Sequence, residues 1–143
     1  LFETYQMDDA EVAVVVLAST AGTARYVVDQ MRAQGLKVGL LKPRVFRPFP
    51  AKELAQALAH VKVIGVMDRS ISFGAMNNAG PLFLELCAAL QIYGERIPMT
   101  DYVYGLGGRD ILPGQIETVY RDLLRIKDTG KIEQLVTYLG VRE

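Results

Sequence analysis

Cysteine and histidine are scarce in this sequence, which has one of each in 143 residues, Cys87 and His60. Zinc ions and iron–sulfur clusters are held in proteins mainly by several cysteine or histidine ligands. This chain alone therefore cannot build a cysteine-ligated metal site. A single cysteine also excludes a disulfide framework. The lack of such a framework is typical of proteins from a reducing compartment. We expect the chain to be cytoplasmic.

Net charge and long apolar runs are missing as well. Sixteen basic and sixteen acidic residues cancel, so the chain lacks the positive field expected of a protein that binds nucleic acid or an anionic membrane. No apolar run reaches the roughly 18 residues that cross a bilayer, and no charged-then-apolar leader is visible. We therefore expect neither nucleic acid nor a membrane among the partners.

The composition that is present is typical of one globular domain. Half of the residues are hydrophobic and 22% are charged, and 143 residues leave room for one real core. The first residue is Leu1 rather than methionine. We interpret residues 1–143 as a single domain taken from a longer protein.

Strand-like and helical patterns alternate along the chain. Continuous apolar runs predict buried strands, and apolar residues three or four positions apart predict helices. The expected strands cover residues 3–6, 11–18, 37–41, 61–67 and 97–104, and the expected helices cover residues 24–34, 51–60, 82–91, 115–127 and 132–139. Three prolines exclude regular structure in residues 43–50. The alternation predicts an α/β fold with a mostly parallel sheet between helix layers.

Glycine is concentrated after the last of these strands. Three glycines, Gly105, Gly107 and Gly108, precede Arg109 and Asp110. Such spacing indicates backbone with positive φ, or backbone that passes closer to another surface than a Cβ allows. It does not match the Gly-x-Gly-x-x-Gly pattern of dinucleotide-binding loops. The stretch is expected to be a docking surface or a ligand loop.

Four loops are expected at the carboxyl ends of the parallel strands, where ligand surfaces of such sheets gather. They carry residues 19–23, Arg44 with Arg47, Asp68 with Arg69, and Arg109 with Asp110. One interpretation is an anion site, in which guanidinium groups and helix N-termini hold a phosphate or carboxylate. The other is that each arginine pairs with a neighbouring aspartate or contacts an adjoining domain.

No catalytic group is indicated by the remaining polar residues. The spacing of the aspartates does not single out an acid and a base, and solvated turn residues are the default interpretation for Asp8, Asp9, Asp68, Asp101 and Asp110. His60 is expected on the surface. Cys87 lies in an apolar helical pattern and is expected to be an inert core thiol.

Five motifs taken in order resemble one known family. They are Ser19–Thr23, Lys42–Pro50, Asp68–Gly74, Gly80–Phe83 and Tyr104–Ile111. Together they resemble the second domain of the alpha chain of pyruvate (2-oxoacid):ferredoxin oxidoreductases, also called pyruvate synthases. The resemblance implies a three-layer α/β/α domain similar to the carboxyl-terminal domain of transketolases. Its mostly parallel sheet would have five strands, with the first strand antiparallel.

The resemblance also implies a function. Enzymes of this family, known from anaerobic metabolism, decarboxylate a 2-oxoacid on thiamine diphosphate, pass electrons through iron–sulfur clusters to ferredoxin and transfer the acyl group to coenzyme A. Thiamine diphosphate, Mg²⁺ and the clusters would be bound by the rest of the enzyme, with no cofactor in this segment. The segment would be catalytically silent and would contact other domains and subunits. The expected interface or anion-binding residues are Arg44, Arg47, Arg69, Gly105, Gly107, Gly108, Arg109 and Asp110.

Two alternatives remain open. The chain could be a free-standing α/β domain that binds a phosphorylated ligand such as coenzyme A at its arginine-rich edge. It could also be an oligomerisation module, because the helix expected at residues 82–90 is apolar nearly all round.

Overall fold

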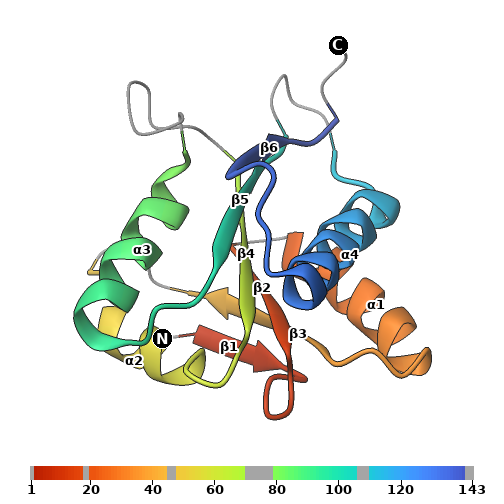
Figure 1. The fold of residues 1–143 in the computed structure, drawn as a ribbon. Helices are drawn as coiled ribbons and strands as arrows, with labels where there is room; N and C mark the ends of the chain where they lie inside the picture. The colour runs from red at the N-terminus through yellow and green to blue at the C-terminus, as the bar shows by residue number, and fades with distance from the viewer. Residues whose placement is uncertain (1, 18–19, 45–47, 70–78, 106–109, 141–143) are drawn as a thin grey trace.

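The structure is a computed structural model that describes residues 2–17, 20–44, 48–69, 79–105 and 110–140. Strands and helices alternate along these residues, as Figure 1 shows. The strands are β1 (Phe2–Tyr5), β2 (Val12–Val16), β3 (Val38–Pro43), β4 (Val63–Asp68), β5 (Met99–Val103) and β6 (Val136–Tyr138). The helices are α1 (Thr20–Ala33), α2 (Ala51–Ala57), α3 (Pro81–Tyr93) and α4 (Pro113–Thr129).

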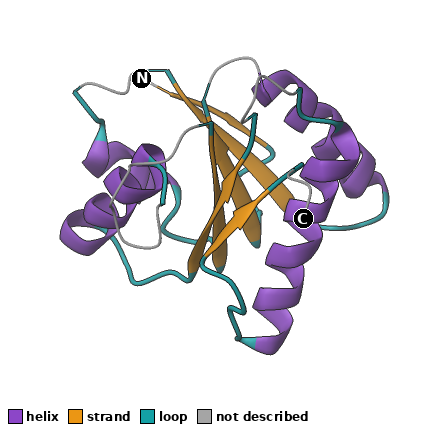
Figure 2. Cartoon of the chain, turned by 90° about the horizontal axis from the view of Figure 1, so that it is seen from above, coloured by secondary structure: helices purple, strands orange, loops and turns teal. Residues whose placement is uncertain are grey.

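The strands form one sheet in the order β1-β3-β2-β4-β5-β6. Strand β1 is antiparallel to β3, and every other neighbouring pair is parallel. Helices α1 and α4 cover one face of the sheet, and α2 and α3 cover the other (Figures 1 and 2). The expected three-layer α/β/α fold with an antiparallel first strand is therefore confirmed.

The central strands are apolar throughout because both of their faces are covered. All five residues of β2 are buried. Val12 and Val14 belong to the core shared with α1 and α4, whereas Ala13 and Val15 belong to the core shared with α2 and α3. A continuous β-branched run therefore fits a parallel strand between two helix layers better than an alternating run would.

The prediction of a helix over residues 132–139 is wrong. Helix α4 ends at Thr129 and is capped by Gly130, which has a left-handed φ of 73°. Further along the chain, residues 136–138 form β6 beside β5. The backbone N–H of Asp101 donates to the carbonyl of Leu135 at 2.8 Å, and the N–H of Leu139 donates to the carbonyl of Val103 at 2.8 Å. The open edge of β5 thus decides the conformation, and the described sheet has six strands rather than five.

The boundaries of β3 and α2 are among those that differ from the expected ones. Strand β3 continues through Pro43, although residues 43–50 were expected to lack regular structure. Pro43 lies beyond the last residue that β3 pairs with β2, Leu41, so its missing N–H is tolerated there. Helix α2 ends at Ala57, three residues before His60.

Within the described ranges, no helix has both the length and the apolar character needed to cross a membrane.

Candidate functional site

The expected arginine edge lies at the carboxyl ends of the parallel strands. Arg44, directly after β3, is exposed and forms an ion pair with Glu3 of β1. Arg69, directly after β4, is also exposed. Strand β2 lies between β3 and β4, so the two strand ends are separated by about 10 Å. For Arg44, this pairing with an acidic neighbour fits the interpretation that the arginines of the edge form ion pairs rather than an anion site.

Arg69 is held over an aromatic ring. Its guanidinium lies 5.5 Å from the centre of the Tyr104 ring, and the Tyr104 hydroxyl shares a hydrogen bond of 2.9 Å with the hydroxyl of Thr20 at the start of α1. A cation over a ring in this range is attracted by the ring's negative face. Tyr104, directly after β5, thus positions this arginine, and Thr20 of α1 holds the Tyr104 hydroxyl in turn.

Gly105 meets both conditions that a glycine was expected to meet in this stretch. Its φ is +72°, and a Cβ added to it would lie 2.8 Å from Nε of Arg69. Of the other predicted site residues, Asp110 is exposed, while Arg47, Gly107, Gly108 and Arg109 lie outside the described residues. The structure therefore brings Arg69 and Gly105 together and leaves Arg44 paired elsewhere on the edge.

Two aspartates beneath this edge are buried, which overturns their interpretation as solvated turn residues. Asp68 at the end of β4 is 4% exposed, and Asp101 in β5 is 0% exposed. The register pairs Val66 with Asp101, so both aspartates lie on the face of the sheet that α2 and α3 cover. Asp101 was expected within the strand over residues 97–104, whereas Asp68 was expected in the loop that follows the strand over residues 61–67.

The first turn of α3 donates its backbone N–H groups to these carboxyl groups. The N–H groups of Leu82 and Phe83 donate to Oδ1 and Oδ2 of Asp68 at 2.9 and 3.0 Å. The N–H of Gly80 donates to Oδ2 of Asp101 at 2.7 Å. Helix α3 has no side-chain cap of its own, so two strand residues satisfy N–H groups that a helix start leaves unpaired.

Burial changes the acidity of both groups. Desolvation, and then the hydrogen bond and charge of the neighbouring Asp68, raise the pKa of Asp101 to about 8. Burial also raises the pKa of Asp68, against the hydrogen bonds from Asp101 and from the N–H groups of Leu82 and Phe83, which lower it. Two carboxyl groups that interact this closely lose their protons in two steps, and the apparent pKa of each step is a property of the pair rather than of one residue.

These residues do not fit a metal ion or an iron–sulfur cluster. Both oxygens of Asp68 accept backbone N–H groups, and so does one oxygen of Asp101. Among the residues that the structure describes, no three His, Cys, Asp or Glu side chains gather as metal ligands do. The described donor set therefore offers neither a diphosphate-bound Mg²⁺ site nor a cluster site.

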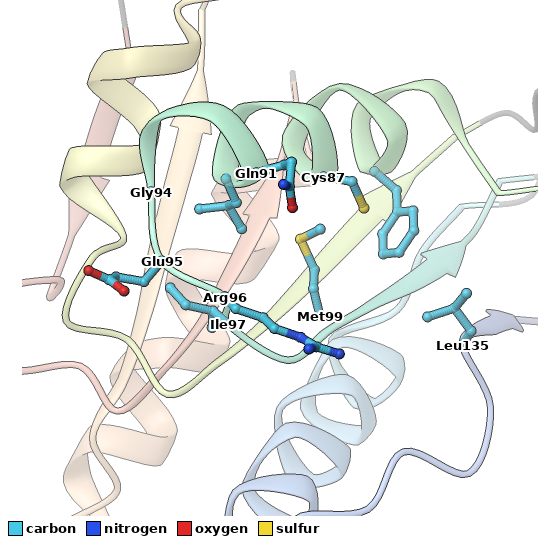
Figure 3. Close-up of a pocket in the computed structure, with 10 residues that line it drawn as sticks. Cys87, Gln91, Gly94, Glu95, Arg96, Ile97, Met99 and Leu135 are labelled. Atoms are coloured by element: carbon cyan, nitrogen blue, oxygen red, sulfur yellow. The ribbon is translucent and has the colours of Figure 1, made fainter.

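A second candidate site is an apolar pocket of about 450 Å³ at the other end of the sheet, before β5 (Figure 3). Phe83, Cys87 and Leu90 of α3 line it together with Met99 and with Leu135, which precedes β6. Burial raises the pKa of the Cys87 thiol to about 11, so the thiol stays protonated near neutrality. The sequence did not indicate this pocket, because Leu135 is distant in the sequence from the other lining residues, which fall within residues 83–99.

His60 is exposed, as expected, and its Nε2 lies 2.5 Å from the carbonyl oxygen of Met7. The histidine therefore joins the β1–β2 turn to the end of α2.

Comparison with protein families gives a match over most of the chain. The family model for pyruvate:ferredoxin oxidoreductase core domain II matches residues 10–116. Pyruvate synthase subunit PorA of Thermotoga maritima is 43% identical over 141 residues, which are 99% of this chain and 34% of that subunit. Ketoisovalerate oxidoreductase subunit VorA of Pyrococcus horikoshii is 38% identical over 142 residues, 99% of this chain and 35% of that subunit. The chain spans about a third of the length of these relatives.

Two solved structures have a similar fold. One is a 2-oxoglutarate:ferredoxin oxidoreductase from Magnetococcus marinus with 2-oxoglutarate, coenzyme A and succinyl-CoA bound, with a TM-score of 0.62 and 20% identity over 87% of this chain and 20% of that chain. The other is a split-gene transketolase in an inactive β4 tetramer, with a TM-score of 0.67 and 12% identity over 87% of this chain and 42% of that chain. At these identities the likeness concerns the fold.

Proposed function

Because this chain belongs to the pyruvate:ferredoxin oxidoreductase core domain II family, we propose that it is a non-catalytic interface domain of a 2-oxoacid:ferredoxin oxidoreductase. The whole enzyme would convert pyruvate or a related 2-oxoacid, coenzyme A and oxidised ferredoxin to acyl-CoA, CO₂ and reduced ferredoxin. The observation that carries the proposal is the 43% identity to a pyruvate synthase subunit along 99% of this chain.

The contacts of the two buried carboxyl groups support the placement of the cofactors outside this domain. Asp68 and Asp101 are occupied by the first turn of α3 and by each other. In this proposal, thiamine diphosphate, Mg²⁺ and the iron–sulfur clusters are bound by other domains and subunits of the enzyme, and the enzyme is cytoplasmic. This domain's own task would be to hold the carboxyl edge of its sheet against those parts.

The contact surface that fits this task is the cluster Arg69, Tyr104 and Gly105. Arg69 is exposed, is positioned by the Tyr104 ring and has close backbone beside it at Gly105. An arginine restrained in this way loses little conformational entropy when it binds a carboxylate or phosphate on a partner. Arg44, Arg47, Gly107, Gly108, Arg109 and Asp110 would extend the surface on the same edge.

The test uses the assembled enzyme with Arg69→Ala, and with Arg121→Ala as the control. Arg121 lies on α4, where it is paired with Glu117 in the same helix. We expect Arg69→Ala to weaken subunit association in sedimentation and to lower activity in dilute enzyme, with recovery at high protein concentration. Unchanged association would reject the interface role of Arg69. Binding of thiamine diphosphate and Mg²⁺ by residues 1–143 alone, at micromolar affinity in calorimetry, would reject the placement of these cofactors outside this domain.

A second candidate function is contact with the phosphates of coenzyme A. It is favoured by the exposed guanidinium of Arg69, whose described contact is an aromatic ring rather than a carboxylate. In this case Arg69→Ala raises the KM for coenzyme A while association stays unchanged. Arg69→Lys restores little, because lysine cannot reproduce a bidentate contact. Subunit association and the KM for coenzyme A therefore distinguish an interface role of Arg69 from a ligand-binding role.

A further inference from the structure

We propose that Asp68 and Asp101 share one proton as a pair: Asp101 stays protonated and donates a hydrogen bond to the ionised Asp68. The single negative charge on Asp68 then holds the first turn of α3 against the sheet. The pair would make the packing of α3 sensitive to pH. This inference concerns the fold at the carboxyl edge and does not depend on the proposed enzyme.

The geometry requires the two groups to interact. They lie on neighbouring strands, on the same face of the sheet, and are 4% and 0% exposed. Asp68 accepts two backbone N–H groups from the first turn of α3, and Asp101 accepts one from Gly80. The N-terminus of a helix favours one negative charge, but a second buried charge beside the first is strongly unfavourable.

The oxygen atoms show where the proton belongs. Three of the four carboxyl oxygens accept a backbone N–H. The fourth, Oδ1 of Asp101, is buried and has no hydrogen-bond partner among the described residues when it is counted as an acceptor. A proton on this oxygen turns it into a donor to Asp68, so that each of the four carboxyl oxygens of the pair has a hydrogen-bond partner.

No described cation takes the place of that proton. The groups that act on the pKa of Asp101 are Asp68 and the backbone N–H groups of residues 80 and 102, and those that act on Asp68 are Asp101 and the N–H groups of residues 82 and 83. On α3, burial and then the charge of the Asp101 carboxyl group raise the pKa of the Cys87 thiol. Arg69 of the next loop lies over Tyr104 instead.

The pH dependence follows from proton uptake on folding. The pKa of Asp101 is raised from 3.8 to about 8, so the folded chain keeps a proton that the unfolded chain loses. This contribution to stability is fully present below pH 3.8, declines as the pH rises towards 8 and is lost above it. The N–H of Tyr104 donates to the carbonyl of Asp68 at 2.9 Å, so one backbone hydrogen bond joins Asp68 to the residue whose ring lies under Arg69.

The test compares chemical unfolding of the intact chain and of Asp101→Asn between pH 5 and 9. The asparagine amide reproduces the protonated carboxyl group, with N–H groups facing Asp68 and an oxygen facing Gly80. We expect the ratio of the unfolding constants, parent to variant, to rise by up to tenfold per pH unit and to level off near pH 8. Asp8→Asn, at an exposed position, is the matched control and should show no such trend.

The reciprocal variant distinguishes the two members. Asp68→Asn removes the charge that faces two N–H groups, so we expect it to be less stable than Asp101→Asn at every pH. Carboxyl ¹³C NMR of the parent chain gives a second measurement that does not depend on either variant folding. Three outcomes would each overturn the assignment of the proton to Asp101. The unfolding constants of the parent and Asp101→Asn could depend on pH in the same way, or only that of Asp68→Asn could be independent of pH. The third outcome is an Asp101 carboxyl signal that titrates near pH 4.

Discussion

Gly80 lies so close to the carboxyl group of Asp68 that a Cβ on the glycine would overlap the Cγ and Oδ2 atoms of the aspartate. The same glycine donates its N–H to Asp101 and precedes the first turn of α3. Its φ of −77° is open to any residue, so the requirement for glycine at this position comes from the close approach of the aspartate.

Gly80→Ala is expected to destabilise the chain. The added methyl group must displace either the Asp68 carboxyl group or the first turn of α3, and overpacking of this kind costs about 1–3 kcal/mol. Chemical unfolding measures the loss. The control is Gly22→Ala in α1, where a Cβ meets no atom within 4 Å and where alanine should be neutral or stabilise the helix by about 0.5–1 kcal/mol. Equal effects of the two substitutions would contradict the packing.

Tyr120→Phe should lower the free energy of unfolding by about 1–3 kcal/mol. The Tyr120 hydroxyl is buried and donates to the carbonyl of Gly39 in β3 at 2.7 Å, so its removal leaves a buried acceptor without a donor. The measurement is chemical denaturation. Tyr26→Phe, at a position that is 57% exposed, should change little. A neutral Tyr120→Phe would mean that this hydrogen bond adds nothing between α4 and the sheet.

Glu11 is expected to stabilise the fold near neutral pH and to lose this contribution in acidic solution. The ammonium groups of Lys127 and Lys62 lie 3.2 and 3.5 Å from its carboxylate and, Lys127 foremost, hold its pKa below the usual 4.5. A carboxyl group with a lowered pKa stabilises the fold above its unfolded pKa and loses this contribution as the pH falls. Glu11→Gln should therefore differ from the parent above pH 4.5 and converge with it in more acidic solution.

Thermal unfolding between pH 3 and 7 checks this expectation. The exposed Glu95 offers a control, because its conversion to glutamine should leave the pH profile of the melting temperature close to that of the parent. A constant difference between Glu11→Gln and the parent across the whole range would reject the ion-pair explanation. It would point to packing of the Glu11 side chain instead.

Cys87 is expected to react slowly with alkylating reagents. Burial, and then the Asp101 carboxyl group, raise the pKa of its thiol to about 11, so about 0.1% is thiolate at pH 8. Iodoacetamide labelling followed by mass spectrometry should be far slower than for free cysteine, and fast only after denaturation. Rapid labelling of the folded chain would show that the pocket beside α3 leaves the thiol accessible and ionised.

Local patterns in the sequence located most helices and strands. The β-branched run at residues 12–16 became β2, and Ala24, Val27, Val28 and Met31 became the buried stripe of α1. The prediction failed where a neighbour decided the outcome: apolar spacing over residues 132–139 fits a helix, yet residues 136–138 pair with β5. Hydrogen bonds with a distant strand leave no periodic trace in the segment itself.

The candidate site was predictable only in part. The sequence indicated that Arg44 and Arg69 lie at the same sheet edge and that Gly105 needs unusual backbone. It did not indicate that Arg44 is paired with Glu3, because residues 3 and 44 meet only when β1 aligns antiparallel to β3. The contact of Arg69 with Tyr104 likewise requires the parallel register of β4 and β5.

The sequence by itself determined the α/β class, the order of the central elements and the family, because apolar periodicity and ordered motifs are properties of the linear chain. Only the tertiary structure decided the roles of Asp68 and Asp101. Each is a single acidic residue in an apolar strand, and nothing local says whether it meets water or another carboxyl group. The register of β4 against β5 and the placement of α3 bring both into one buried site, where desolvation, rather than residue type, sets their chemistry.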